Sequence, residues 1–283
     1  EPHMRAALIR LNPDIAANPG RADDVLYRLR AIVMGARSDG LVKANEEFAA
    51  WLLGERSMPF GANGEHVTIR LIDFDEIERN SFVVTQQFTI RAGKTEKRAD
   101  LVLLVNGIPL VLIEAKTPVR SSQSWLDAAL QVHDDYERNV PELFVPNVFS
   151  VATEGKEFRY GSIRMSVDLW GPWRDSDGKQ SLGEVEKAAA SMLRPAMVLD
   201  MLDSFTAFAT QNGKHRIKII ARYQQVDGVN KIVARVVAGQ PRKGLIWHFQ
   251  GSGKSLLMLF APRKLRLHPA LKNPTVLIVV DRI

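Results

Sequence analysis

The sequence of 283 residues predicts an α/β protein made of two successive α/β units. In the first unit, residues 101–105 and 108–113 are almost continuously apolar, which is typical of central strands that are covered on both faces of a sheet. In the second unit, residues 244–260 read as an apolar strand, a glycine-rich turn and an apolar helix. These observations favour a layered α/β/α domain followed by the start of a second α/β domain.

The composition of the chain favours a polyanionic partner. The formal net charge is +6 and the pI is about 9.6, although charges of both signs are interspersed along most of the chain. The sequence contains no cysteine, which excludes a disulfide framework and a cysteine-based zinc site. We find no secretory segment and no apolar run long enough to span a bilayer, so we expect a cytoplasmic protein with no membrane partner.

The spacing of apolar residues and the position of turn residues predict the order of elements. Helices are expected over residues 22–37, 41–53, 124–136, 184–193, 195–210 and 217–238. Besides the two apolar runs, strands are expected over residues 68–72, 82–90, 148–152, 244–250 and 274–281. Residues 174–183 are largely polar and predict a linker. The predicted domains are therefore residues 1–173 and residues 184–283, the second one truncated.

Two carboxylates and a lysine stand at the ends of the two apolar runs. Asp100 comes directly before the first run, and Glu114 and Lys116 come at the end of the second. Ionised groups at the edge of a core need a partner or a metal to offset their desolvation. Carboxylates that converge on one point are typical of Mg²⁺ sites, where one or two acids and substrate phosphates hold the ion. The alternative is that these groups are solvated strand ends or a surface ion pair.

A shared metal site sets a condition on the hairpin between the two runs. A two-residue turn, the form that an Asn-Gly sequence favours, would pair Val105 with Ile108 and place Glu114 on the face opposite Asp100. The site therefore predicts a longer connection that pairs Val105 with Pro109, or a bulge, with the glycine of the turn at positive φ. Side chains directly opposite each other then start about 5 Å apart, within reach of one cation.

The glycine-rich turn of the second unit has the chemistry of a phosphate loop. Its backbone amides and the following helix N-terminus can cradle phosphates, Lys254 can reach the terminal phosphates, and Ser255 can ligate Mg²⁺. His248 stands where the generic pattern has its first glycine. The alternative is an ordinary turn that caps a helix. We predict that the turn binds nucleotide through Gln250, Gly251, Ser252, Gly253, Lys254 and Ser255.

These motifs, in this order, resemble known enzymes. The order of Asp100, a hairpin and Glu114-x-Lys116 resembles the PD-(D/E)xK nuclease superfamily, with Ala99 in place of the usual proline. The chain from about residue 80 onward closely resembles the restriction (R, motor) subunit of type I restriction-modification enzymes, a family in which the histidine at position 248 is usual. The resemblance includes Asn80-x-Phe-Val-Val-x-x-Gln-Phe88, Arg98-x-Asp100, Asn106-Gly-Ile-Pro-Leu110, Glu114-x-Lys116, Arg222-Tyr-x-Gln225, Trp247-His-x-Gln-Gly-Ser-Gly-Lys-Ser255 and Val279-Val-Asp-Arg282.

The resemblance implies a PD-(D/E)xK endonuclease domain and the start of a RecA-like motor domain of the superfamily 2 helicase type. It implies that Asp100, Glu114 and the carbonyl of Ala115 hold Mg²⁺. It also implies that Lys116 orients or helps to deprotonate the attacking water and steadies the charge that develops on the phosphate.

Two further elements carry over from the family. Its nucleases have a Gln and a Tyr on the helix after the nuclease strands, for which Gln131 and Tyr136 are the candidates. They are five residues apart where the usual interval is four, and positions five apart do not share a face of an α-helix. A solvated Gln and a packed Tyr are the alternative. Gln225 resembles the glutamine that contacts adenine upstream of the phosphate loop in helicase-like motors, so ATP is the expected nucleotide.

The function that the resemblance implies is that of a Mg²⁺-dependent endonuclease and ATP-dependent DNA translocase. Such a subunit would cleave double-stranded, unmodified foreign DNA after translocation, in complex with methylation and specificity subunits. One alternative is another DNA-repair helicase–nuclease fusion. Another is a non-catalytic DNA-binding or assembly module, against which the intact Asp100, Glu114 and Lys116 argue.

Overall fold

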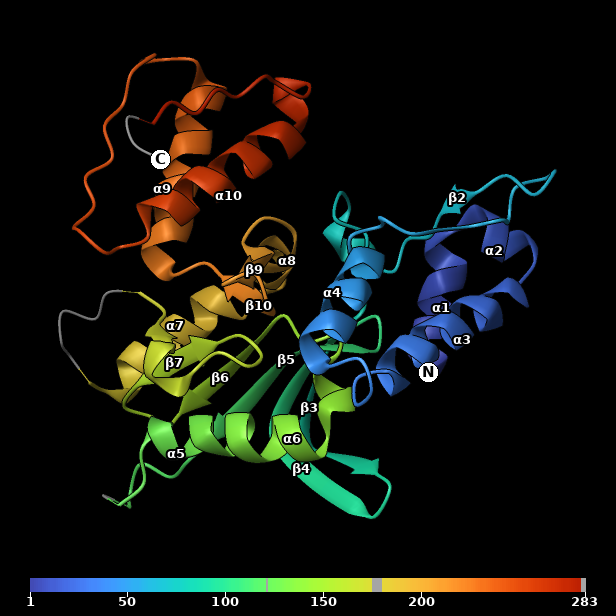
Figure 1. Ribbon diagram of the computed structural model, residues 1–283, viewed down its shortest axis with the longest axis horizontal. Coiled ribbons are helices and arrows are strands. Elements are labelled where there is room, and N and C mark those ends of the chain that lie inside the picture. Colours follow the sequence, from blue (N-terminus) through green and yellow to red (C-terminus); the bar gives the residue numbers. More distant parts are fainter. Residues whose placement is uncertain (121, 175–179, 281–283) are drawn as a thin grey trace.

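A mixed sheet at the centre of the protein carries the hairpin of residues 95–115, here called the acidic hairpin because it contains Asp100 and Glu114 (Figure 1). The computed structural model describes residues 1–120, 122–174 and 180–280. Within them the main sheet has six strands in the order β3-β4-β5-β6-β7-β8, and β1-β2 and β10-β9 form two small antiparallel sheets. In the main sheet only β5 and β6 run parallel. The strands are β1 Ser57–Met58, β2 Val67–Thr68, β3 Phe82–Ala92, β4 Thr95–Val105, β5 Ile108–Ala115, β6 Phe149–Thr153, β7 Phe158–Gly161, β8 Gly171–Pro172, β9 Thr206–Gln211 and β10 His215–Ile220.

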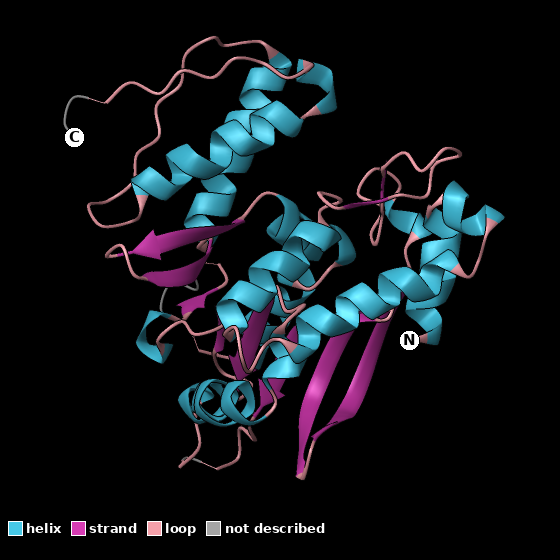
Figure 2. Ribbon diagram, turned by 45° about the vertical axis from the view of Figure 1, so that its right-hand side comes forward, coloured by secondary structure: helices cyan, strands magenta, loops and turns pink. Residues whose placement is uncertain are grey.

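Helices surround this sheet (Figure 2). The α-helices are α1 Pro2–Leu11, α2 Pro13–Ala17, α3 Arg21–Met34, α4 Leu41–Leu52, α5 Trp125–Leu130, α6 Glu137–Asn139, α7 Leu182–Met192, α8 Pro195–Asp203, α9 Tyr223–Ala238 and α10 Lys254–Leu267. Short 3-10 segments are η1 Ile77–Arg79, η3 Pro141–Phe144, η4 Val167–Leu169 and η5 Pro269–Leu271, and η2 Gln131–Tyr136 is a π-helix. None of the helices in the described ranges combines the length and the apolar character that crossing a bilayer would need.

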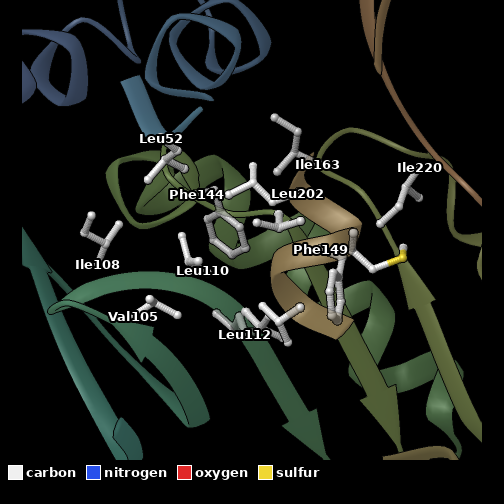
Figure 3. Packing of buried hydrophobic residues seen from close by; sticks show 14 of the residues in the cluster. Leu52, Val105, Ile108, Leu110, Leu112, Phe144, Phe149, Ile163, Leu202 and Ile220 are labelled. Atoms are coloured by element: carbon white, nitrogen blue, oxygen red, sulfur yellow. The ribbon is translucent and has the colours of Figure 1, made fainter. Parts of the chain in front are cut away.

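The main sheet is covered on both sides, as its apolar strands predict. The continuous helical segment α5-η2-α6 lies along one face and contacts β5 and β6 through α5 (Figure 1). On the other side, Leu52 of α4, Phe144 of η3 and Leu202 of α8 gather over the strands that carry Leu110 and Phe149 (Figure 3). The expected mixed α/β architecture with helices on both faces is confirmed.

The hydrophobic core continues across the predicted domain boundary. The rings of Tyr160 and Trp173 lie edge to face with centroids 5.7 Å apart, and those of Trp173 and Tyr223 are 5.4 Å apart. The hydroxyl of Tyr160 donates a hydrogen bond to the carbonyl of Ala221 at 2.7 Å. Residues 175–179 of the predicted linker lie outside the described residues, and the domain limits stay a prediction. What the structure shows is that both predicted units share buried contacts.

Two of the expected helices are partly wrong. The helix predicted over 195–210 ends at Asp203, and β9 follows; the helix predicted over 217–238 begins only at Tyr223, because its first residues belong to β10. The two strands form a hairpin whose connection contains Asn212 and Gly213, both at positive φ. An Asn-Gly pair between two runs is a hairpin signal, and the helical spacing of apolar residues concealed it.

The expected strands over 244–250 and 274–281 are also wrong for the described residues, which have no strand at 244–250 or 274–280; residues 281–283 lie outside the description. A buried parallel strand needs hydrogen-bonded neighbours and helices on both faces. Neither segment has them here, and the side chains of Leu245 and Trp247 are 85% and 88% exposed. The expected strand over 68–72 shrinks to Val67–Thr68.

Lys218 of β10 is a buried cation at the contact between the two units. Its ammonium donates to the carbonyl of Asn147 at 2.5 Å. Burial lowers the pKa of the Lys218 ammonium to about 7, and the negative charge of Glu137 opposes this shift only in part. Below this pKa the folded protein bears the full cost of a buried charge.

We predict that Lys218→Met stabilises the protein at pH 7 by roughly 1 to 4 kcal/mol, because it removes the desolvation penalty of a buried ammonium while Arg164 still balances the buried carboxylate of Glu137. Between pH 7 and 10 the unfolded chain binds more protons at this lysine than the folded one, so wild-type stability rises with pH and the difference between the two proteins shrinks. Urea unfolding across this range measures it. Lys214→Met, in the exposed turn of the same hairpin, is the control. A variant that is less stable than wild type at pH 7 would contradict the prediction.

Candidate functional site

The acidic hairpin turns through two residues. Val105 pairs with Ile108, and Asn106 and Gly107 have φ of 53° and 81°, as in a type I′ turn. The predicted pairing of Val105 with Pro109 is therefore wrong, whereas the positive φ of the glycine is confirmed. The reason is the Asn106 side chain, which is 0% exposed and hydrogen-bonded at both its oxygen and its nitrogen, so it holds the tight turn in place.

A bulge corrects the register two pairs beyond the turn. Leu104 pairs with Pro109, but Leu103 pairs with Val111, which leaves Leu110 as one extra residue on β5. One extra residue reverses the face of every side chain that follows it on its strand. The bulge that the shared metal site required is confirmed.

Beyond the bulge the register brings the two acids together. Leu101 pairs with Ile113, and the next pair in this register is Asp100 with Glu114. The backbone N–H of Ala115 donates to Oδ2 of Asp100 at 3.0 Å, which fixes the two strands at this level. The carboxylates of the two strands therefore face the same space.

Glu114 has one oxygen bonded and one free. The residue is 3% exposed, and its Oε1 accepts a hydrogen bond from Nζ of Lys116 at 3.2 Å. Its Oε2 is buried without a hydrogen-bond partner among the described residues. Burial, and next the negative charge of Asp100, raise the pKa of the Glu114 carboxyl, while Lys116 lowers it. A buried acceptor that lacks a donor, beside a second carboxylate, is what a bound cation would satisfy.

A π-helical turn delivers both Gln131 and Tyr136 to this cluster. Oε1 of Gln131 accepts a short hydrogen bond from Nζ of Lys116, and Nε2 of Gln131 donates to the hydroxyl of Tyr136 at 2.6 Å. The hydroxyl in turn donates to the carbonyl of Arg98 on β4 at 2.9 Å. Because residues 131–136 are π-helical, with i→i+5 hydrogen bonding, positions five apart become neighbours. The structure thus brings together the pair that an α-helix would separate.

The electrostatics of the cluster favour a proton on Tyr136. Burial, and then the charge of Glu114, raise the pKa of the Tyr136 hydroxyl to about 12. At neutral pH the hydroxyl therefore stays protonated and donates its hydrogen bond. A series of hydrogen bonds therefore connects the backbone of β4, through Tyr136 and Gln131, to Lys116.

The residues present fit a Mg²⁺ site of the kind that substrate completes. Asp100 and Glu114 supply two carboxylates, within the one or two that such sites commonly use, and one of their oxygens is unpaired. Across residues 1–120, 122–174 and 180–280 no three His, Cys, Asp or Glu side chains converge, so a site made only of such side chains is not present there. The Ala115 carbonyl as a third ligand stays a prediction.

Sequence reasoning gave no role to Gln87, which also reaches the site. Its Nε2 donates to Oδ1 of Asp100 at 3.1 Å, from the neighbouring strand β3. The signal that could have identified it is its place in the segment of residues 80–88 that carries part of the family resemblance.

The glycine-rich turn leads into a helix as expected, although its flanking strand does not form; phosphate binding by the turn stays a prediction. Gly251 and Gly253 have φ of 83° and 79°, conformations in which glycine is favoured, and α10 begins at Lys254. Nζ of Lys254 donates to the carbonyls of His248 and Phe249 at 3.2 and 3.1 Å, so the lysine folds back over its own loop. Gln250 and Ser255 are exposed beside it.

The buried side chain of Gln225 is hydrogen-bonded to the backbone of this loop. It is 1% exposed, and its Nε2 donates to the carbonyls of Ser252 and Gly253, both at 3.2 Å. Its Oε1 accepts from the backbone N–H of Arg222 at 2.9 Å. Both ends of the amide are therefore engaged within the chain, and the predicted contact of Gln225 with adenine stays a prediction.

Known sequences match both parts of the chain. The family model described as Type I restriction enzyme R protein N terminus matches residues 1–165, and a model described as SWI2/SNF2 ATPase matches residues 224–283. The Type I restriction enzyme HindI endonuclease subunit of Haemophilus influenzae is 34% identical over 99% of this chain. The Type I restriction enzyme SauMSSORF170P endonuclease subunit of Staphylococcus aureus is 27% identical over 76% of it. The chain spans 27% and 22% of the lengths of these two relatives.

We predict that Tyr136→Phe lowers the free energy of unfolding by about 1 kcal/mol, because the buried hydroxyl satisfies both the Gln131 amide and the Arg98 carbonyl. Urea unfolding measures the change. Tyr27→Phe is the control, since that side chain is 73% exposed. An equal loss of unfolding free energy in the two variants would show that the hydrogen bonds of the Tyr136 hydroxyl contribute nothing to stability.

Proposed function

The chain belongs to the type I restriction enzyme R protein family, and we propose from this that it carries a Mg²⁺-dependent nuclease site and the first part of an ATP-driven DNA motor. The nuclease would have the PD-(D/E)xK fold and the motor a RecA-like fold. The whole subunit would cleave double-stranded, unmodified foreign DNA after ATP-driven translocation. The domains proposed for these tasks are residues 1–173 and 184–283.

One observation carries the nuclease proposal. Asp100 and Glu114 stand opposite each other only because the hairpin contains a bulge, and the Oε2 of Glu114 is left buried and unpaired. A solvated strand end or a simple ion pair needs neither feature. The arrangement is therefore better explained by a cation that both acids hold.

Each residue around Asp100 and Glu114 would have its own role in phosphodiester hydrolysis. Mg²⁺, when bound to Asp100, Glu114 and the Ala115 carbonyl, would act as a Lewis acid toward the phosphate and the attacking water. The ammonium of Lys116, close to Glu114, would orient that water and stabilise negative charge on the phosphate. Gln131 would hold the ammonium in place through its Oε1.

Tyr136 would act one step further from the reaction. Its hydroxyl ties Gln131 to the backbone of β4, which also carries Asp100. We expect these hydrogen bonds to keep the lysine and the carboxylates at a constant separation while DNA enters. Such preorganisation of the groups around a reacting phosphate is a main source of catalysis.

For the motor, the loop of residues 250–255 would bind the phosphates of ATP. Support comes from the two positive-φ glycines at the N-terminus of α10 and from the match of residues 224–283 to a SWI2/SNF2 ATPase. Lys254 would leave its backbone carbonyls and bind the terminal phosphates, and Ser255 would ligate Mg²⁺. Sequence recognition would reside in a partner, within a complex that includes methylation and specificity subunits.

The first test separates the two activities. In the full-length subunit, assembled with its partners, Glu114→Gln and Lys116→Ala should each reduce DNA cleavage by at least roughly 100-fold. The first removes a carboxylate proposed to hold Mg²⁺, and the second removes the ammonium proposed to stabilise charge on the phosphate. ATP hydrolysis should remain nearly unchanged. Gel assays of plasmid cleavage and phosphate release measure the two rates. A comparable loss of both rates in folded Glu114→Gln protein would contradict the proposed separation.

The second test concerns nucleotide. Lys254→Ala in the full-length subunit should eliminate ATP hydrolysis, since the loop loses the cation that reaches the terminal phosphates. DNA cleavage by the complete enzyme should disappear with it, because cleavage is proposed to follow translocation. Lys243→Ala, an exposed lysine outside the loop, is the control. Cleavage that survives in Lys254→Ala would show that translocation is not required.

A further inference from the structure

Gln87 has an unusual backbone conformation in the middle of a strand. Its φ is 52°, although it belongs to β3 and the pairs on both sides of it keep regular antiparallel register with β4. Non-glycine residues seldom adopt positive φ, and where they do the surrounding structure commonly holds them at a functional site. In this register Gln87 lies directly opposite Asp100.

The side chain of Gln87 gains one specific contact from this conformation. Gln87 is exposed to solvent, so packing does not hold its side chain. Its Nε2 donates to Oδ1 of Asp100 at 3.1 Å. On the other side, the N–H of Ala115 donates to Oδ2 of the same carboxylate at 3.0 Å. Asp100 is thus held by one donor from each of its two neighbouring strands.

Two donors on two different oxygens fix the plane of a carboxylate. Each oxygen keeps a second lone pair for another partner, because an ionised carboxylate accepts about four hydrogen bonds or metal contacts. Glu114 has a single donor, Lys116 at its Oε1, and its second oxygen is left free. Asp100 is therefore the acid whose orientation is fixed before a cation arrives.

We propose that Gln87 is the positioning residue of this site, which holds Asp100 in the orientation that binds the divalent cation. The inference rests on the proposed nuclease function, and it adds a residue that the sequence motif of two acids and a lysine does not contain. Hydrogen-bond partners of metal ligands commonly change metal affinity or activity by 10- to 100-fold when they are removed. Gln87 acts through Asp100 and needs no contact with the cation itself.

The test is titration calorimetry of Mn²⁺, as the probe ion, with the full-length subunit in the absence of nucleotide and DNA. Glu114→Gln defines the background binding. Gln87→Ala and Gln87→Gly should each raise the Mn²⁺ dissociation constant by roughly 10-fold or more. Gln86→Ala is the matched control, because Gln86 is the same residue type, is exposed on the same strand, and has no hydrogen bond to the acids among the described residues. Its affinity should equal that of wild type.

Gln87→Gly separates positioning from strain. Glycine adopts positive φ without steric cost, so this variant should unfold at or above the wild-type temperature in the absence of metal while it still binds Mn²⁺ weakly. The Mg²⁺ concentration for half-maximal DNA cleavage should rise by the same factor, and saturating Mg²⁺ should restore most of the rate.

The outcomes distinguish this inference from the function on which it rests. Wild-type affinity in Gln87→Gly would overturn the positioning role and leave the metal site standing. No difference between wild type and Glu114→Gln would overturn the metal site, and with it both proposals. A rate that stays low at saturating Mg²⁺ with unchanged Mn²⁺ affinity would assign Gln87 to contact with DNA instead.

Discussion

The bulge at Leu110 is the feature on which the candidate nuclease site depends. Side chains alternate along a strand, so the tight turn that Asn106 stabilises would by itself direct Glu114 away from Asp100. One extra residue on β5 reverses that alternation and leaves the rest of the ladder regular. The same extra residue sets the face of Lys116, which follows Glu114 by two positions. The turn therefore satisfies the buried Asn106 side chain, and the bulge separately places the two acids on one face.

The helix opposite this hairpin contains a comparable irregularity. An α-helix would turn Gln131 and Tyr136 to different faces, and the π-helical turn realigns them so that one side chain reaches Lys116 and the other the backbone of β4. A π-helical turn is rare, and single turns of this kind inside α-helices are frequently found at functional sites. Both the strand and the helix that carry the site therefore depart from regular geometry by one residue. This pattern is expected where function competes with ideal local structure.

The sequence predicted structure correctly where two distant residues had to lie close together in space. It failed where only the local pattern of residues was available. The bulge could be predicted because two acids on one face leave few registers. The π-helix could not, because i→i+5 bonding has no local sequence signal, and only the five-residue spacing of Gln131 and Tyr136 hinted at it. The β9–β10 hairpin was concealed by apolar spacing that also fits a helix, although Asn212-Gly213 marks its turn. Residues 244–250 form no strand, because a strand depends on neighbouring strands as much as on its own sequence.

The arrangement also bears on how the two proposed activities stay separate. The units share a core, since Tyr160 of β7 bonds to the carbonyl of Ala221 and packs on Trp173. A flexible tether therefore does not explain independence. The polar groups around Asp100 and Glu114 lie instead between β4, β5 and the α5-η2 helix. Within the described residues, none of their hydrogen bonds reaches a residue beyond 180. A change of charge at Glu114 that keeps its shape leaves the shared core intact, whereas truncation of Tyr160 disturbs both units. The proposed separation of the two activities would therefore follow from the position of these polar groups within one continuous core.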